Sequence, residues 1–237
     1  MPTATRANVA ALIPAYLEEK HIRDVATRAR AQLDLVLVVD DGSSDQTSTE
    51  AKAAGAELAR HEKNAGKGAA IKTGLRTLLA REGIEYFLIL DGDGQHLPEE
   101  IPHFLTAAND TGAPMIVGNR MSDVRTMPFV RKWTNRYMSW KISRVIGQQV
   151  PDTQCGFRMF ARSLASEFID TVSIAFDFET EMLAIAARKG CQIAVAKVTT
   201  VYGDEVSKIH PWRDTVKFFR LLGRLKREAR TARAGRS

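Results

Sequence analysis

The sequence predicts an α/β protein with a mostly parallel central sheet flanked by helices. Apolar runs alternate with helical patterns through the first half of the chain, which is the order of elements in α/β folds. The apolar runs are nearly continuous rather than alternating, as expected of parallel strands that are buried on both faces. Acidic, glycine-containing segments follow two of these runs, where ligands bind in such sheets.

The elements of the first half are expected in strict alternation. Strands are predicted within 8–16, 33–43, 56–62, 86–94 and 114–120, and helices over 18–32, 45–54, 68–81 and 98–109. Gly55 and Gly83 follow the second and third helices, where a glycine commonly ends a helix. Pro98, with two glutamates after it, is typical of a first helical turn.

The second half of the chain is less regular. A helix is predicted over 129–146, with four aromatic residues on one side, namely Phe129, Trp133, Tyr137 and Trp140. A second helix is predicted over 177–189 and a strand within 191–202. We expect one catalytic domain over residues 1–210 and a basic amphipathic tail over residues 211–237.

The segment "YFLILDGDGQH" contains the first candidate site. Asp-Gly is typical of a hairpin turn, but the next segment, "LPEEIPHFLTAAN", is typical of a helix, which indicates a strand end instead. Asp91, Asp93 and Gln95 would then present oxygen ligands at the tip of a buried strand. Such ligands suit Mg²⁺ or Mn²⁺.

Other polar residues carry a weaker signal. In "VVDDGSSDQT", a carboxylate such as Asp41 could accept hydrogen bonds from a base or ribose, whereas the serines could simply cap the next helix. "NAGKGAAIKTG" fits neither common glycine-rich phosphate pattern, although Lys67 at a helix start could meet an anion. Arg158 lies in an apolar stretch, which suggests an anionic partner. Arg120 and Lys208, taken singly, look like ordinary surface residues.

Composition excludes several classes of protein. The chain has 237 residues, 44% of them hydrophobic, and no membrane-length apolar window. Its two cysteines are expected to be free thiols in the cytoplasm. Residues 211–237 hold nine basic and two acidic side chains, whereas the whole chain has a net charge of +6, so the body is close to neutral. This distribution and the lack of a recognisable nucleic-acid fold argue against nucleic-acid binding.

Eight motifs, taken in order, resemble the family-2 nucleotide-sugar glycosyltransferases with the GT-A fold, and most of all the dolichol- and polyprenyl-phosphate sugar synthases. They are "LIPAYLEE", "VVDDGSSDQT", "NAGKGAAIKTG", "LDGDGQHLPE", "GNR", "DTQCGFRMF", "FDFETEML" and "YGDEVSKI". The likeness covers roughly residues 8–210. The chain departs from the family pattern in having no basic residue just before "SK" and no membrane-spanning C-terminus.

The resemblance implies a role for each matching residue. The nucleotide-sugar would be bound by Pro14, Ala15, Tyr16, Glu18, Asp41, Lys67, Asp91, Gly92, Asp93, Arg120 and Lys208. A metal on its diphosphate would be held by Asp91, Asp93 and Gln95. The acceptor would face Arg120, Arg131 and Arg158. The catalytic residues would be Asp91, Asp93 and Arg158.

The acceptor is the open question at this stage. Transfer would invert the sugar's configuration; a lipid phosphate needs no general base, whereas a hydroxyl acceptor needs one, for which Asp152 or Glu179 are the candidates. Residues 120–146 hold seven basic side chains, one acid and the four aromatics. This mixture favours polyprenyl or dolichyl phosphate and a peripheral position on the inner face of the membrane. The alternative is a core helix with a solvated basic face.

Overall fold

The computed structural model describes residues 1–122, 127, 129–171, 178–199 and 223. The side chains of residues 130 and 131 lie outside this description. Three of the expectations therefore fall outside it: the side chain of Arg131, Lys208, and the tail over residues 211–237 apart from Gly223.

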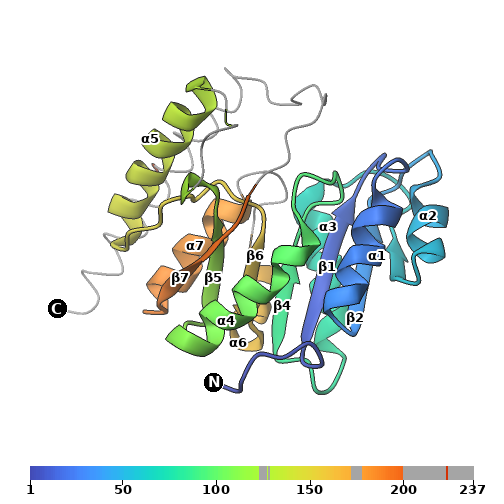
Figure 1. The fold of residues 1–237 in the computed structure, drawn as a ribbon, viewed down its shortest axis with the longest axis horizontal. Coiled ribbons are helices and arrows are strands. Elements are labelled where there is room, and N and C mark those ends of the chain that lie inside the picture. Colours follow the sequence, from blue (N-terminus) through green and yellow to red (C-terminus); the bar gives the residue numbers. More distant parts are fainter. Residues whose placement is uncertain (123–126, 128, 172–177, 200–222, 224–237) are drawn as a thin grey trace.

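A seven-stranded sheet forms the centre of the molecule (Figure 1). Its strands are β1 (Val9–Ala15), β2 (Leu35–Asp40), β3 (Glu57–Arg60), β4 (Tyr86–Ile89), β5 (Met115–Asn119), β6 (Arg158–Ala161) and β7 (Ile193–Lys197). They are ordered β3-β2-β1-β4-β6-β5-β7. Only β6 runs antiparallel to its neighbours, β4 and β5. The prediction of a mostly parallel sheet is therefore confirmed.

Helices cover both faces of the sheet (Figure 1). One layer holds α1 (Ile22–Gln32), α2 (Thr47–Ala53) and α4 (Ile101–Thr111), with the short 3₁₀ helix η1 (Pro98–Glu100) leading into α4. The opposite layer holds α3 (Lys67–Leu79), α6 (Arg162–Ile169) and α7 (Phe178–Arg188). α5 (Phe129–Ile146) packs on α7, and η2 (Arg120–Ser122) follows β5.

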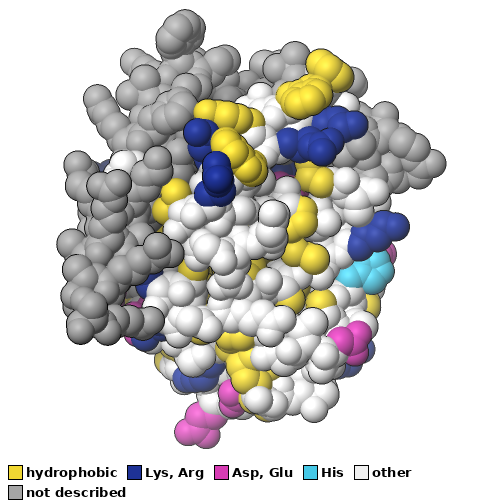
Figure 2. Space-filling model, turned by 90° about the vertical axis from the view of Figure 1, so that its left-hand side faces the viewer, with side chains coloured by type: hydrophobic (Ala, Val, Ile, Leu, Met, Phe, Trp, Pro, Cys, Tyr) yellow, Lys and Arg dark blue, Asp and Glu magenta, His cyan; other side chains and the backbone are white. Residues whose placement is uncertain are grey.

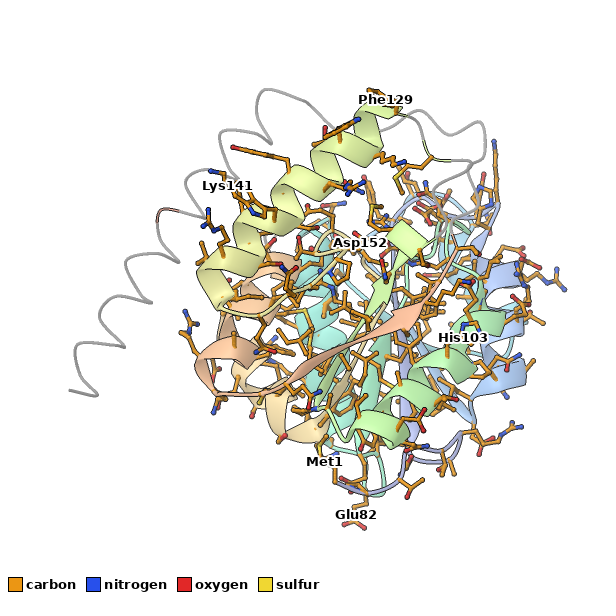
Figure 3. All side chains as sticks on the ribbon, turned by 60° about the vertical axis from the view of Figure 1, so that its left-hand side comes forward. Met1, Glu82, His103, Phe129, Lys141 and Asp152 are labelled. Carbon is orange, nitrogen blue, oxygen red and sulfur yellow. The ribbon has the colours of Figure 1, made fainter. Side chains whose placement is uncertain are left out.

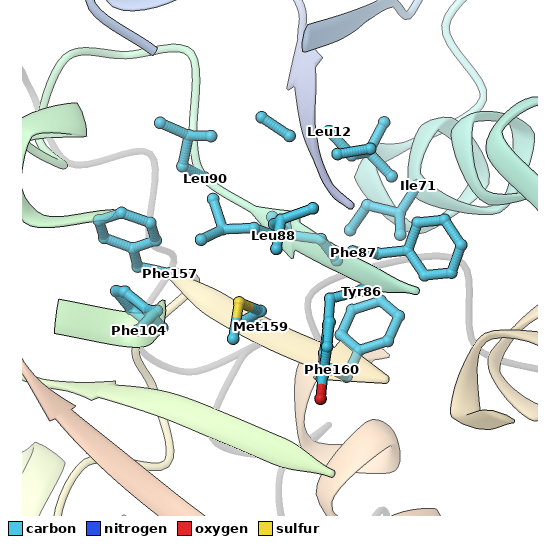
Figure 4. Close-up of a cluster of buried hydrophobic side chains, with 14 of the residues drawn as sticks. Leu12, Ile71, Tyr86, Phe87, Leu88, Leu90, Phe104, Phe157, Met159 and Phe160 are labelled. Atoms are coloured by element: carbon cyan, nitrogen blue, oxygen red, sulfur yellow. The ribbon is translucent and has the colours of Figure 1, made fainter. Parts of the chain in front are cut away.

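The core is packed where β4 and β6 lie against α3 and α6. Figure 4 shows this cluster, in which the rings of Phe87 and Phe160 lie 5.9 Å apart. Phe160 also meets Phe168 of α6 edge-on, with their ring centroids 4.9 Å apart. Gly74 brings α3 close to the sheet, since a Cβ there would lie 2.1 Å from a methyl carbon of Leu12. This packing fixes where α3 begins.

The structure follows the sequence closely in the first half and adds two elements in the second. The five expected strands and four expected helices of residues 8–120 are all present. The strands are shorter than expected, whereas α3 begins earlier than expected, at Lys67, and α4 ends later, at Thr111. A helical segment follows β4, so the hairpin alternative for "DGDGQH" is excluded. β6 and α6 were not predicted from the sequence.

The orientation of α5 decides between the two interpretations of that helix. Its aromatic side chains point outward, with Phe129 73% exposed and Trp133 58% exposed. Its buried side instead carries small polar residues such as Ser139 and Ser143. The alternative of a core helix with its aromatics inside is therefore wrong.

Candidate functional site

The carboxyl ends of β1, β2 and β4 lie next to one another at one edge of the sheet (Figure 1). Ala15 pairs with Asp40 across β1 and β2, so both strands end at the same level. The loop after β4 lies against the end of β1, because a Cβ on Gly92 would be 3.4 Å from the carbonyl oxygen of Pro14 and from Cβ of Ala15. Three of the expected nucleotide-binding positions therefore lie together.

The loop after β1 is held by hydroxyl groups from the next motif. Leu17 has a φ of 58°, an unusual backbone conformation for a residue with a side chain. Its N–H donates to Ser43 Oγ at 2.9 Å, and the N–H of Glu18 donates to Thr47 Oγ1 at 2.8 Å. Ser43 thus supports the loop rather than capping α2. Tyr16 is left 39% exposed at the edge of the site.

Asp41 anchors a neighbouring loop instead of pointing to an open site. It is only 2% exposed, and it accepts hydrogen bonds from the N–H groups of Ala65 and Gly66 at 2.9 and 2.7 Å. His61 Nδ1 lies 2.7 Å from the same carboxylate. This geometry departs from the expected nucleotide contact, because protein donors already engage both oxygens of Asp41.

Three charged side chains meet beside the end of β4. The ammonium nitrogen of Lys67, the first residue of α3, lies 2.7 Å from Asp91 Oδ1 and 2.8 Å from Glu179 Oε1. Glu179 comes from the first turn of α7. The chain at Gly156 passes so close that a Cβ there would lie 2.9 Å from Asp91 Oδ2. A larger residue at this position would displace the Asp91 carboxylate.

These charges determine one another's protonation. Burial raises the pKa of Asp91, but the attraction and hydrogen bond of Lys67, together with the attraction of His96 and Arg120, outweigh burial, and the pKa falls to about 2. Burial lowers the pKa of Lys67, whereas Asp91 and Glu179 together raise it above its ordinary value. Both Asp91 and Lys67 are therefore charged at neutral pH.

The rest of the loop after β4 is held by its own polar groups. Gln95 donates its backbone N–H to Asp93 Oδ1 at 3.0 Å. The N–H of Asp91 lies 3.1 Å from His96 Nδ1, and the His96 ring stacks on Phe157 at a centroid distance of 5.1 Å. Burial lowers the pKa of His96 to about 4, so its Nδ1 is free to accept this hydrogen bond at neutral pH.

The oxygen atoms of this loop fit a divalent cation. Asp91 Oδ1 is buried and has no polar partner among the described residues except the Lys67 ammonium. Asp93 and Gln95 add a carboxylate and an amide oxygen, which are ligands that Mg²⁺ and Mn²⁺ accept. Within the described ranges, no three His, Cys, Asp or Glu side chains form a cation site by themselves. Mg²⁺ is commonly bound through one or two carboxylates and completed by substrate phosphates.

Arg120 and Asp152 form a buried ion pair. Arg120 Nε and Nη2 donate to the two oxygens of Asp152 at 2.7 and 2.9 Å. Asp152 is fully buried inside the fold (Figure 3). Asp152 was one of two candidates for a general base, and this geometry disfavours it, because a bidentate arginine engages both oxygens of the buried carboxylate. Arg120 itself is only 7% exposed.

Arg158 is occupied by the backbone. It is fully buried, and it donates to the carbonyl oxygens of Cys155 at 2.7 Å, Thr153 at 2.8 Å and Glu179. The expected contact with an acceptor phosphate is not what the structure shows, because all three guanidinium nitrogens bind carbonyl groups. Arg158 instead joins the segment before β6 to the start of α7.

Sequence reasoning missed the partners that organise this site. His61 and His96 were visible in the sequence but had no assigned role, because the residues they contact come from other strands or lie across a turn. Glu179 was named only as a possible base, whereas it lies within ion-pair distance of Lys67. An acid in the first turn of a helix was the one available signal.

Comparisons with known proteins agree with this architecture. A model of the family described as glycosyl transferase family 2 matches residues 10–169. The chain is 34% identical to the uncharacterised protein MJ0544 of Methanocaldococcus jannaschii, over 82% of this chain and 89% of that protein. It is 29% identical to a UDP-N-acetylglucosamine–dolichyl-phosphate N-acetylglucosaminyltransferase of Methanococcus voltae, over 81% of this chain and 84% of the relative.

A solved structure shows the same fold. The chain resembles glucosyl-3-phosphoglycerate synthase of Mycobacterium tuberculosis, determined in complex with Mn²⁺, uridine diphosphate and phosphoglyceric acid. The TM-score is 0.66 at 17% identity, and the match covers 97% of this chain and 78% of that one. The GT-A fold predicted from the sequence is therefore confirmed.

The buried position of Arg158 generates a stability prediction. Arg158→Lys keeps the charge but loses the planar set of donors, so at least one carbonyl hydrogen bond is lost. A hydrogen bond to a charged group contributes about 1.5–3 kcal/mol, and we expect the unfolding free energy to fall by about that amount. Urea unfolding followed by circular dichroism measures it.

Arg23→Lys is the matched control for this experiment, since the Arg23 side chain is 63% exposed. It should change stability by less than about 0.5 kcal/mol. A variant at Arg158 that unfolds at the wild-type urea concentration but no longer transfers sugar would instead support the anion contact expected from the sequence.

Proposed function

The chain belongs to glycosyl transferase family 2 and is a glycosyltransferase that uses a nucleotide-sugar donor, and from this premise we propose that it transfers the sugar to a polyprenyl or dolichyl phosphate. The observation that carries the proposal is the exposed aromatic and basic surface of α5 beside the site. The relative from Methanococcus voltae is named as acting on dolichyl phosphate, which supports the same acceptor class.

The donor would lie across the ends of β1 and β4. Pro14, Ala15 and Gly92 form the floor there, and Tyr16 is exposed at its border, where it can contact a base. Glu18 follows on the same loop. Asp41 would act indirectly, by holding the loop that leads to Lys67. Lys67 would place a positive charge next to the donor's diphosphate.

Asp91, Asp93 and Gln95 would hold Mg²⁺ or Mn²⁺ against the donor's diphosphate. The related structure from Mycobacterium tuberculosis, which shares the fold, contains Mn²⁺ with uridine diphosphate. The metal, when bound, stabilises negative charge on the leaving diphosphate. Lys67 adds a second positive charge to the same region, which lowers the barrier to departure.

An inverting, in-line attack follows from this placement. The donor's diphosphate would lie on the Asp91 and Asp93 side, so the acceptor approaches the anomeric carbon from the opposite face. A phosphate oxygen is already an anion, so the site needs no general base. Asp152 could not serve as one, because Arg120 holds both of its oxygens.

A hydroxyl acceptor is the second candidate, and one observation favours it. Glu179 keeps a carboxylate at the site, with its side chain 12% exposed and its Oε1 2.8 Å from Lys67 Nζ. That carboxylate is the one we propose to take the proton of a hydroxyl acceptor. The Lys67 ammonium, however, already pairs with this carboxylate.

The α5 surface would face a membrane. Fully burying a large apolar side chain contributes roughly 1.5–3 kcal/mol, yet α5 leaves four aromatic side chains exposed and forgoes much of that stabilisation. Lys141 lies over the Tyr137 and Trp140 rings, with its ammonium 5.4 and 5.0 Å from their centroids. Figure 2 shows hydrophobic and basic side chains gathered on this face. Aromatic and basic residues together suit an anionic lipid interface.

None of the helices in the described part of the chain is both long enough and apolar enough to span a bilayer. The contact that we propose with lipid is one in which α5 lies on the membrane surface. Its orientation is set by the polar inner side of α5, where Ser139 Oγ accepts the N–H of Thr153 at 2.9 Å and Ser143 Oγ accepts that of Val150 at 3.0 Å.

The acceptor class is tested directly. We expect labelled sugar to appear in lipid when a panel of nucleotide sugars is offered with a short-chain polyprenyl phosphate. The matching polyprenol, which lacks the phosphate, should accept none. Transfer to the polyprenol or to a soluble sugar hydroxyl at a comparable rate would contradict the proposed acceptor and favour Glu179 as a base.

Removal of one proposed metal ligand should abolish turnover. Asp93→Asn keeps the size of the side chain and removes its charge, and we expect transfer to fall roughly a hundredfold or more. Titration calorimetry with Mn²⁺ and the nucleoside diphosphate should show weaker binding. Asp110→Asn, at an exposed position of α4, is the control. Normal turnover of the Asp93 variant in excess chelator would disprove the metal role.

The membrane contact makes a separate prediction. Lys141→Gln with Arg144→Gln removes two bases from α5, each worth about 1 kcal/mol near an anionic surface. We expect the fraction that sediments with vesicles of phosphatidylglycerol and phosphatidylcholine to fall. High salt should release the wild-type protein in part.

Lys20→Gln with Lys52→Gln is the matched control, because both lysines are exposed and lie away from α5. A chain ending at Pro211 tests the tail in the same assay. If the α5 variant sediments with vesicles as the wild-type protein does, and only the truncated chain loses binding, the membrane contact belongs to the tail and not to α5.

A further inference from the structure

One ammonium group forms ion pairs with two carboxylates at the site. Lys67 Nζ lies between Asp91 Oδ1 at 2.7 Å and Glu179 Oε1 at 2.8 Å. All three side chains are largely shielded from water, with exposed fractions of 21%, 26% and 12% for Lys67, Asp91 and Glu179. Without Lys67, two like charges would be left together in a region of low dielectric, which is costly.

Asp91 Oδ1, which pairs with Lys67, is also the atom that would bind a metal. Asp91 Oδ1 is buried, and Lys67 is its one polar partner within the described ranges. Mg²⁺ binds its oxygen ligands at about 2.0–2.1 Å. A cation there and an ammonium 2.7 Å from the same atom would repel each other across a few ångströms. The metal and Lys67 therefore compete for Asp91.

We propose that Lys67 is an internal counter-cation that occupies Asp91 in the free enzyme and gives it up only when metal and nucleoside diphosphate arrive together. The inference rests on the proposed role of Asp91 as a metal ligand. The diphosphate carries enough negative charge to compensate both the metal and the displaced ammonium. A metal ion that arrives without the diphosphate brings no such negative charge, so it binds weakly.

Glu179 is the positioning residue of this exchange. It pairs with the same ammonium as Asp91 does, so Lys67 keeps one partner after it leaves the other. The backbone of Glu179 is held in turn, because its carbonyl oxygen accepts a hydrogen bond from the buried Arg158. The start of α7, and with it the resting place of Lys67, is therefore fixed from the core.

Gly156 has no side chain, and this leaves space for Lys67 and Asp91 to separate. A Cβ at this position would lie 2.9 Å from Asp91 Oδ2 and 3.3 Å from Lys67 Nζ. Any larger residue would press on both members of the pair. The glycine in "CGF" thus lets the two charges approach each other and separate without a steric barrier.

Binding of Mn²⁺ alone, measured by electron paramagnetic resonance of the free ion, tests the exchange without activity. Lys67→Met removes the competing charge and keeps a flexible chain of similar length. We expect its affinity for Mn²⁺ alone to rise about tenfold or more, as for loss of a unit charge within roughly 4 Å. Its affinity for uridine diphosphate in the presence of Mn²⁺ should fall.

Three further variants make the result decisive. Lys63→Met removes an exposed charge of the same sign nearby, so it reports the general electrostatic effect. Lys67→Arg keeps the charge and should leave the affinity for Mn²⁺ alone low. Lys67→Gln repeats the neutral substitution should Lys67→Met prove unstable in circular dichroism.

The outcomes separate this inference from the proposed function. One outcome would overturn the exchange but not the metal site. In it, the wild-type enzyme binds Mn²⁺ together with uridine diphosphate, and the neutral Lys67 variants gain no more affinity for Mn²⁺ alone than Lys63→Met does. Absence of Mn²⁺ binding in every variant, with or without the nucleotide, would overturn the exchange and the metal role of Asp91 together. A higher affinity for Mn²⁺ alone that is confined to the neutral Lys67 variants supports the exchange.

Discussion

The meeting of Asp91, Lys67 and Glu179 is the interaction on which the rest of the site depends. Charges held this close, and largely out of water, persist only when each has a partner. Each comes from a different element: the end of β4, the start of α3 and the first turn of α7. The packing of α3 on β1, and of α7 on the segment before β6, therefore serves the charge balance as well as the core.

Two buried arginines explain how that balance is kept in place. Arg120 holds Asp152, and Arg158 donates to the carbonyls of Thr153, Cys155 and Glu179. Together they fix the segment that carries Gly156 past Asp91. In this arrangement both guanidinium groups donate to protein oxygens, and through these hydrogen bonds they position the groups around Asp91.

The sequence was sufficient for the strands whose ends form the site, because continuous apolar runs followed by acids are typical of parallel sheets. It could not give the role of Arg158, since an arginine in an apolar stretch looks the same whether it binds an anion or carbonyl groups. Asp41 posed the same ambiguity. The spacing of aromatics on α5 predicted a common face, but only tertiary packing shows that this face is exposed.

The donor site and the α5 surface share one segment of backbone, and this links the two halves of the proposed reaction. α5 holds Thr153 through Ser139, with the Thr153 N–H 2.9 Å from Ser139 Oγ. Three residues later, Gly156 borders Asp91 and Lys67. A helix that rests on a membrane would therefore place the charged centre at a fixed height above the lipid surface. The lipid phosphate that we propose as the acceptor would then have to bring its head group to that centre while its hydrocarbon chain stayed in the bilayer, so the height set by α5 would decide which head groups can react.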